Sequence, residues 1–163
     1  MLNRRSIQKL RKKHIAPSFS VSYDKPLHIV FGKGQYLYDS DGNKFLDAVN
    51  NIQHIGHSHP KVIEAIEIQS KKLNVNTRYL DETIVKYAKE LVQKLPVDLE
   101  ICYFTNSGSE SNDLALRIAR MLSKSKETIV LDGAYHGHTS ALIEVSPYKF
   151  NGLGGSGCPD FVH

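Results

Sequence analysis

Two segments of this chain carry side chains whose types and spacing suit the binding of a phosphorylated ligand. In the first, residues 105–110, Ser107 and Glu110 have the spacing of a capping box, so a helix should begin here. The free amides at that helix N-terminus, the open approach at Gly108 and the hydroxyl of Ser109 would bind a phosphate group. Helix capping alone is the alternative explanation of the same residues.

The second segment, residues 132–139, is rich in glycine and hydrogen-bonding side chains and contains Tyr135. Each segment follows an apolar run, 101–104 or 128–131, with the length and composition of a buried strand. Apolar residues recur at helical spacing over 114–122, between the two runs. Because neighbouring parallel strands of a βαβ unit end at one crevice, we expect the phosphate site and Tyr135 to face one flat, phosphorylated cofactor.

Residues 106–113 and 135–139 resemble the two signatures of class III aminotransferases, which are pyridoxal-phosphate enzymes of fold type I. The likeness extends along nearly the whole chain. Residues 74–80 and 143–150 resemble one branch of this family, the alanine-glyoxylate aminotransferase 2-like proteins. That branch includes phospho-lyases that act on ethanolamine phosphate and 5-phosphohydroxylysine.

The resemblance implies an α/β fold, namely the N-terminal part of a fold type I transferase that depends on pyridoxal 5'-phosphate. A mainly parallel sheet flanked by helices would follow a small antiparallel hairpin segment. Residues 1–49 would belong to the small domain, and residues 50–163 would form the first, truncated part of the large cofactor-binding domain.

The resemblance also implies which residues contact the cofactor and the substrate. Gly108 and Ser109 would hold the cofactor phosphate, and Tyr135 would stack on its pyridine ring. The full set implied in cofactor binding is Ser107, Gly108, Ser109, Tyr135 and His136. The stretch that lines the substrate end of the pocket in the family would include Asn50, Asn51 and His54.

Two catalytic groups of this family have no counterpart in the chain. Pyridoxal chemistry needs a lysine that forms a Schiff base and an acid that pairs with the pyridinium nitrogen, and in the resembled family both lie further downstream. None of the 15 lysines has the apolar, strand-end setting that would depress its pKa. We therefore expect the front portion of a longer, homodimeric enzyme, and an isolated polypeptide that is catalytically silent and marginally folded or aggregation-prone.

The expected function of the whole enzyme is transamination of small-molecule amino-group substrates. A phospho-lyase that eliminates phosphate from ethanolamine phosphate or 5-phosphohydroxylysine is the first alternative. A non-catalytic, truncated chain or pseudoenzyme that pairs with a related subunit is the second. A nucleotide or nucleic-acid binding module is the least favoured, because it depends only on a basic N-terminus and weak glycine motifs.

The net charge of +4 comes from the N-terminus, since residues 1–23 hold six basic residues and no acidic one. This charge run favours a solvated segment over a nucleic-acid arm or a mitochondrial presequence. No apolar run has membrane-spanning length, and the two cysteines suit a reducing compartment. We therefore expect a cytoplasmic protein without nucleic-acid or membrane partners, or a matrix protein if the basic segment is a presequence.

Supporting elements can also be predicted from local patterns. A short N-terminal helix should end before Pro17, and a small antiparallel sheet should follow. Two further helices are expected, one over 59–73 with Ser58 as its cap and one after Asp81 that ends before Pro96. The strands of the sheet are expected at 29–31, 36–38 and 44–47, and a further strand should begin at 161–163.

Two motifs are interpreted as structural. The three histidines at 54, 57 and 59 have a spacing that suggests a metal site. No cysteine or carboxylate stands nearby in the sequence to complete the coordination shell of a metal ion, so we expect a structural or pocket role for these histidines. Residues 152–157 match G-x-G-x-x-G, but no strand precedes them and Pro159 prevents a following helix. We expect a surface loop there and no metal site in the chain.

Overall fold

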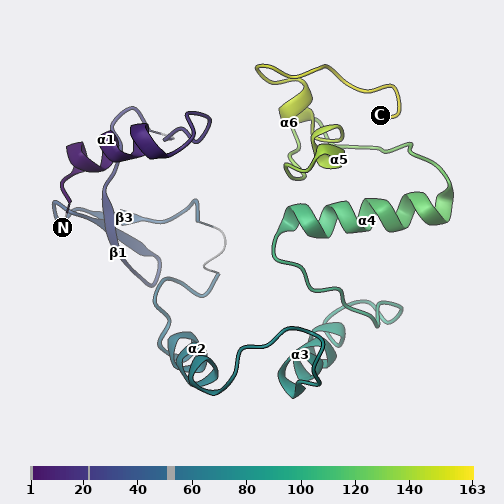
Figure 1. The fold of residues 1–163 in the computed structure, drawn as a ribbon, viewed down its shortest axis with the longest axis horizontal. Coiled ribbons are helices and arrows are strands. Elements are labelled where there is room, and N and C mark those ends of the chain that lie inside the picture. The colour runs from purple at the N-terminus through teal and green to yellow at the C-terminus, as the bar shows by residue number, and fades with distance from the viewer. Residues whose placement is uncertain (1, 22, 51–53) are drawn as a thin grey trace. The chain divides into compact units, whose positions relative to one another are not determined.

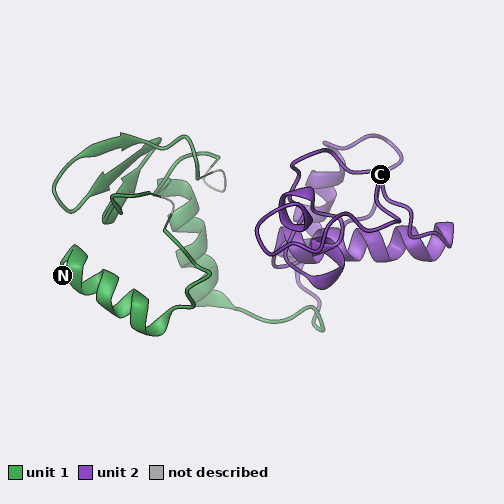
Figure 2. Ribbon diagram, turned by 90° about the horizontal axis from the view of Figure 1, so that it is seen from above, with its two compact units in different colours: residues 1–79 green, residues 80–163 purple. Residues whose placement is uncertain are grey.

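The computed structural model describes residues 2–21, 23–50 and 54–163, and Figure 1 shows the order of their helices and strands. The chain divides into two compact units, residues 1–79 and 80–163 (Figure 2). The predicted domain boundary after residue 49 concerns the domains of a whole enzyme, and it stays a prediction.

The first unit begins with helix α1, Arg4–His14. The Asn3 side chain accepts a hydrogen bond from the backbone N–H of Ser6 at 2.9 Å and so caps the helix. The helix ends at His14, with Ile15 as its C-cap, and thus before Pro17 as predicted. An ion pair of 2.8 Å joins Arg4 to Asp41, which connects α1 to the turn after strand β2.

A three-stranded antiparallel sheet follows α1, in the order β1-β2-β3. Its strands are β1 (Ile29–Lys33), β2 (Tyr36–Asp39) and β3 (Lys44–Leu46). Asp39, only 5% exposed, accepts hydrogen bonds from the backbone and side chain of Asn43 and so closes the β2–β3 turn. The predicted small antiparallel sheet is confirmed.

Helix α2, Pro60–Lys72, begins with proline in its first turn. The predicted cap by Ser58 is wrong, because His59 is the N-cap residue and makes no side-chain capping bond. A bridge between Gly34 and His57 holds this segment against the first hairpin. Ser58 consequently has a positive φ of 56°, and its hydroxyl donates to the Gly32 carbonyl at 2.9 Å instead of to the helix.

The second unit contains the two best-defined predicted helices. Helix α3, Glu82–Val92, is capped by Asp81, which accepts from the Thr83 N–H at 2.7 Å. Helix α4, Gly108–Ser123, has Ser107 as its N-cap and ends at Lys124 in the left-handed conformation. Both helices begin where their capping residues predicted.

Two short helices follow α4, and the core of the second unit forms around them. They are α5 (Ser140–Ile143) and α6 (Pro147–Phe150). The buried apolar side chains, each 7% exposed or less, are Leu142, Val145, Phe150 and Val162. Leu116 of α4 packs against this cluster, so the core joins α4 to α5 and α6.

The two runs predicted as buried strands are not strands here. Residues 101–104 are irregular, with Ile101 82% exposed. Thr128 and Val130 pair only with residues 161–163, through a parallel bridge and three backbone hydrogen bonds of 2.8–2.9 Å. A parallel strand needs a neighbour and covered faces, and the described residues supply only this partial pairing.

The remaining expectations concern the glycine-rich segment and membranes. Residues 152–157 form turns and irregular backbone with no helix after them, as predicted. In the described part of the chain, no helix combines the length and the apolar character that crossing a bilayer requires.

Candidate active site

The N-terminus of α4 is built by reciprocal capping. Ser107 Oγ accepts a hydrogen bond from the Glu110 N–H at 3.1 Å. The Glu110 carboxylate in turn accepts from the N–H of Asn106 at 2.6 Å, one residue before the position that a capping box would use. The predicted helix start is confirmed, and the turn before it is held by its own side chains.

Two amides at this helix end stay available. Among the described residues, no hydrogen-bond acceptor binds the N–H of Gly108 or Ser109. The space beside Gly108 is open, because no heavy atom lies within 4 Å of the position that a Cβ would take there. Unsatisfied amides at the positive end of a 16-residue helix, with open access, form a site that suits a phosphate group.

The segment 132–139 packs directly on this helix end. The N–H of His138 donates to Ser109 Oγ at 3.3 Å, and Asn112 Nδ2 donates to the carbonyl of His136 at 2.8 Å. Gly137, which lies between His136 and His138 in the chain, is buried and has a φ of 144°. A Cβ at this position would lie only 2.8 Å from Ser109 Oγ. The two segments predicted to serve one ligand therefore lie against each other, and only glycine allows this approach.

Tyr135 is 50% exposed, and its ring contacts that of Tyr148. The two ring centroids lie 6.2 Å apart at an interplanar angle of 75°, an edge-to-face contact. Lys149 Nζ lies 5.5 Å from the Tyr135 centroid, within range of a cation–π interaction. Half of the tyrosine surface thus remains open to a planar partner.

His136 is fixed more tightly than sequence reasoning indicated. Its N–H donates to Ser146 Oγ at 3.0 Å, and its carbonyl accepts from Asn112. Its imidazole lines a cavity of about 280 Å³ together with Leu116 and Val130. Nε2 is buried there and has no hydrogen-bond partner in the described part of the chain.

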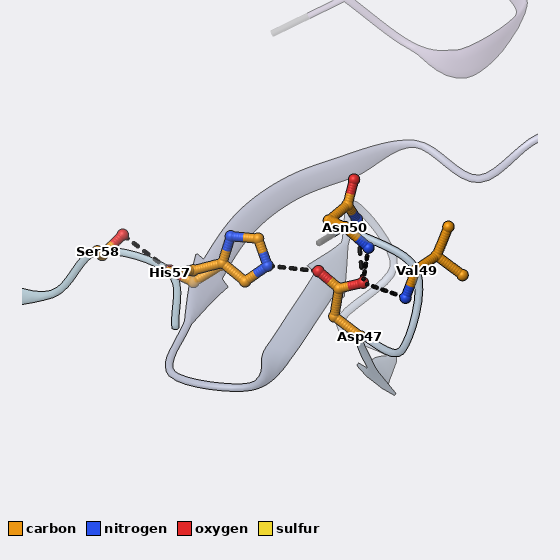
Figure 3. Close-up of polar contacts among 6 residues, drawn as sticks. Asp47, Val49, Asn50, His57 and Ser58 are labelled. Carbon is orange, nitrogen blue, oxygen red and sulfur yellow. Dashed lines mark hydrogen bonds and ion pairs between the residues drawn. The ribbon is translucent and has the colours of Figure 1, made fainter. Parts of the chain in front are cut away.

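Two of the three residues predicted to contact substrate, Asn50 and His54, lie in the described part of the first unit. Asn50 donates its backbone N–H and its Nδ2 to Asp47 Oδ1, at 2.9 and 3.0 Å (Figure 3). His54 is exposed, and Asn51 lies outside the described residues. Asn50 and His54 belong to the first unit, whereas the cofactor candidates belong to the second, and each group is placed within its own unit.

Sequence reasoning missed the role of Asp47. Its Oδ2 lies 2.6 Å from His57 Nε2, and only 6% of the Asp47 side chain is exposed. The pKa of Asp47 lies well below its usual value, first because the Asn50 N–H donates to it and second because of His57. The only sequence signal for this contact was the position of Asp47 ten residues before His57, and Asp47 lies close to that histidine only in the folded unit.

A metal centre is not assembled around these histidines. Within residues 2–21, 23–50 and 54–163, no three histidine, cysteine or acidic side chains lie close enough to hold an ion. His57 is instead engaged with Asp47, and His59 begins helix α2.

Comparison with known proteins gives this geometry a context. The sequence model of the protein family described as aminotransferase class III matches residues 18–154 of this chain. A Drosophila melanogaster protein named alanine–glyoxylate aminotransferase 2-like is 48% identical over 156 residues, which cover 95% of this chain and 32% of that protein. The chain thus spans about a third of the length of this relative.

Two solved structures share the fold. A phospholyase from Arthrobacter, in complex with phosphoethanolamine, superposes with a TM-score of 0.89 at 38% identity over 96% of this chain and 36% of its own. A taurine:2-oxoglutarate aminotransferase from Bifidobacterium kashiwanohense, in complex with pyridoxal phosphate and glutamate, gives a TM-score of 0.80 at 25% identity over 99% of this chain and 37% of its own.

These matches cover nearly the whole chain, and they show the N-terminal part of the fold type I architecture that was predicted. Pyridoxal 5'-phosphate is the cofactor that this architecture carries in the family. The matched residues include the capped start of α4 and residues 132–139, which we call the Tyr135 loop. The site is built from these two segments. This chain belongs to the class III aminotransferase family.

Proposed function

We propose that the polypeptide containing this chain is a pyridoxal-phosphate enzyme that transfers amino groups. The observation that carries the proposal is the packing of residues 135–139 on the start of α4, because it places the half-exposed Tyr135 in a segment attached to the helix end that offers two free amides. A phosphorylated aromatic cofactor needs these two features together.

The phosphate would be held by the N–H groups of Gly108 and Ser109. The Ser107 hydroxyl accepts from the Glu110 N–H, and its own proton remains available for a phosphate oxygen. Hydrogen bonds to a charged group contribute about 1.5–3 kcal/mol each, whereas the helix dipole adds about 0.3–1 kcal/mol. The directed donors would therefore dominate the affinity for phosphate.

Tyr135 would cover one face of the cofactor ring and keep water from it. Its edge-to-face contact with Tyr148 restrains the ring while half of its surface stays open. His136 would act beside it mainly through its backbone, since both peptide groups are engaged within the second unit. When bound, the cofactor supplies an electron sink for reactions at the substrate amine.

The covalently attached lysine and the acid that pairs with the ring nitrogen are assigned to the rest of the enzyme. The proposal is supported by the length of the chain, which spans 32% of the Drosophila melanogaster relative. The 163 residues alone would then bind the cofactor weakly and catalyse nothing.

A phospho-lyase is the second candidate. It is favoured by the structural likeness to the Arthrobacter phospholyase, at a TM-score of 0.89. The name of the Drosophila melanogaster relative favours transamination. In both reactions the residues of this chain would have the same task, which is to hold the phosphate and cover the ring.

The test uses the full polypeptide that the gene encodes, dialysed free of cofactor and titrated with pyridoxal 5'-phosphate. Amino transfer to pyruvate or glyoxylate is then compared with release of inorganic phosphate from phosphoethanolamine and 5-phosphohydroxylysine. Cofactor binding with amino transfer supports the proposal, and phosphate release selects the second candidate. Binding without either reaction indicates a non-catalytic chain, and no saturable binding overturns the assignment.

A further inference from the structure

Ser146 is a fully buried hydroxyl that joins the core of the second unit to the Tyr135 loop. It is 0% exposed, and its Oγ donates to the carbonyl of Leu142 at 2.6 Å. The same oxygen accepts the N–H of His136 at 3.0 Å. A hydroxyl has one proton and two lone pairs, so this arrangement uses its proton completely and fixes its orientation.

Asn112 holds the other side of the same residue. It lies in the second turn of α4, and its Nδ2 donates to the carbonyl of His136 at 2.8 Å. Two residues after His136, the N–H of His138 donates to Ser109 Oγ. The segment is thus attached to α4 at two points and to the core through Ser146, and the Ala134 carbonyl also accepts the N–H of Tyr148 at 3.0 Å.

These contacts fix two successive peptide planes. The N–H of His136 belongs to the peptide that joins it to Tyr135, and its carbonyl belongs to the peptide that joins it to Gly137. Because each peptide is planar, Ser146 and Asn112 together set both backbone dihedrals of His136. The Cα of Tyr135 is then placed relative to α4 before any ligand arrives.

We propose that Ser146 and Asn112 are positioning residues that pre-organise Tyr135 for the cofactor ring. This inference rests on the proposed function, and it assigns a task to residues outside the set implied in cofactor binding. Ordering the loop in advance lowers the conformational cost of binding, so the benefit should appear in cofactor affinity. Ser146 does this from the core, and Asn112 does it from the helix that carries the phosphate site.

Loss of either side chain leaves one polar group of His136 without a partner. We expect Ser146→Ala and Asn112→Ala each to raise the dissociation constant for pyridoxal 5'-phosphate about tenfold, the effect of one lost hydrogen bond to the loop. Asn112 is exposed, and alanine favours a helical conformation. Asn112→Ala should therefore keep the stability of the fold even if Ser146→Ala lowers that stability.

Two substitutions of the same chemical kind serve as matched controls. Ser156 and Asn151 are exposed, and their side chains make no hydrogen bond to another described residue. Ser156→Ala and Asn151→Ala should therefore leave cofactor affinity unchanged. All variants are made in the full polypeptide that the gene encodes.

The experiment combines two measurements. Amide hydrogen exchange of the cofactor-free protein reports whether residues 135–138 become less protected, and equilibrium dialysis gives the dissociation constant of pyridoxal 5'-phosphate. Thermal unfolding of each variant separates a general loss of stability from a local one. We expect faster exchange in 135–138 and weaker binding for both variants, with unchanged values in the controls.

The outcomes separate this inference from the proposed function. If the wild-type protein binds the cofactor and both variants bind it as tightly as the controls do, the positioning roles are refuted while the function stands. Faster exchange with unchanged affinity refutes them as well, because the contacts are then merely structural. If the wild-type protein does not bind the cofactor, both proposals fail.

Discussion

His57 Nε2 lies 2.6 Å from Asp47 Oδ2, which joins the end of β3 to the segment before α2 (Figure 3). Gly34 pairs with the backbone of the same histidine, with bonds of 3.0 and 2.8 Å, so the histidine is held at both its side chain and its main chain. Asp47 also accepts from Val49 and Asn50. The segment that begins with the candidate substrate residue Asn50 is therefore anchored at its two ends.

Acid should weaken this anchor. The folded-state pKa of Asp47 lies below the ordinary value of 3.8 because of the Asn50 N–H and the His57 ring. A carboxyl whose pKa is depressed by folding stabilises the protein above its unfolded pKa and loses that contribution as the pH falls. We expect the stability difference between wild type and Asp47→Asn to be constant above about pH 5 and to shrink from about pH 4 downward.

Urea unfolding at a series of pH values measures this difference. Asp24 is exposed and hydrogen-bonds to no other described residue, so Asp24→Asn controls for the change in net charge. A difference between wild type and Asp47→Asn that stays the same down to about pH 2 would contradict the assignment.

Ser107→Ala should lower the free energy of unfolding by about 1 kcal/mol, because the Glu110 N–H loses its acceptor. Thr139 is a matched comparison, since it occupies the N-cap of α5 without a side-chain capping bond. Thr139→Ala should lose less stability in the same denaturation experiment. Equal losses for the two variants would show that Ser107 does not act as a cap.

Gly137→Ala tests the packing of the Tyr135 loop on α4. The new methyl would clash first with Leu142 Cδ1, and it would also lie 2.8 Å from Ser109 Oγ and 3.0 Å from the Ser109 Cα, in a residue with φ 144°. We expect a loss of about 2–4 kcal/mol from backbone strain and overpacking together.

Gly133→Ala is the control for Gly137, because it combines a positive φ of 68° with open space around the new methyl. It carries backbone strain alone and should cost about 1 kcal/mol. Chemical denaturation of both variants gives the two values. A loss for Gly137→Ala no larger than that for Gly133→Ala would mean that Gly137 is not packed against Leu142 and Ser109.

Gly108→Ala should separate stability from ligand binding. Its methyl meets no atom within 4 Å, and alanine suits a helix, so the unfolding midpoint should stay unchanged or rise. The same methyl would occupy the approach to the free amides and should weaken the binding of pyridoxal 5'-phosphate about tenfold or more. Calorimetric titration checks this, and unchanged affinity would place the phosphate elsewhere.

The sequence alone determined the elements whose signals are local. The caps at Asp81 and Ser107 begin α3 and α4 as predicted, because a capping bond spans only two or three residues. The turn at 40–43 pairs β2 with β3 for the same reason. The resemblance of residues 106–113 and 135–139 to the family's signatures was also enough to indicate the family, which the match over residues 18–154 shows.

The tertiary structure decided every relationship whose two partners lie far apart in the chain. The run 101–104 has the composition of a strand, yet a strand exists only where another segment offers its backbone groups, and nothing within the run specifies that partner. The hydrogen bond between Ser146 and His136 and the contact between Asp47 and His57 each join residues that are ten positions apart in the chain. Such contacts depend on where packing places both ends, and the spacing of residues along the sequence does not encode it.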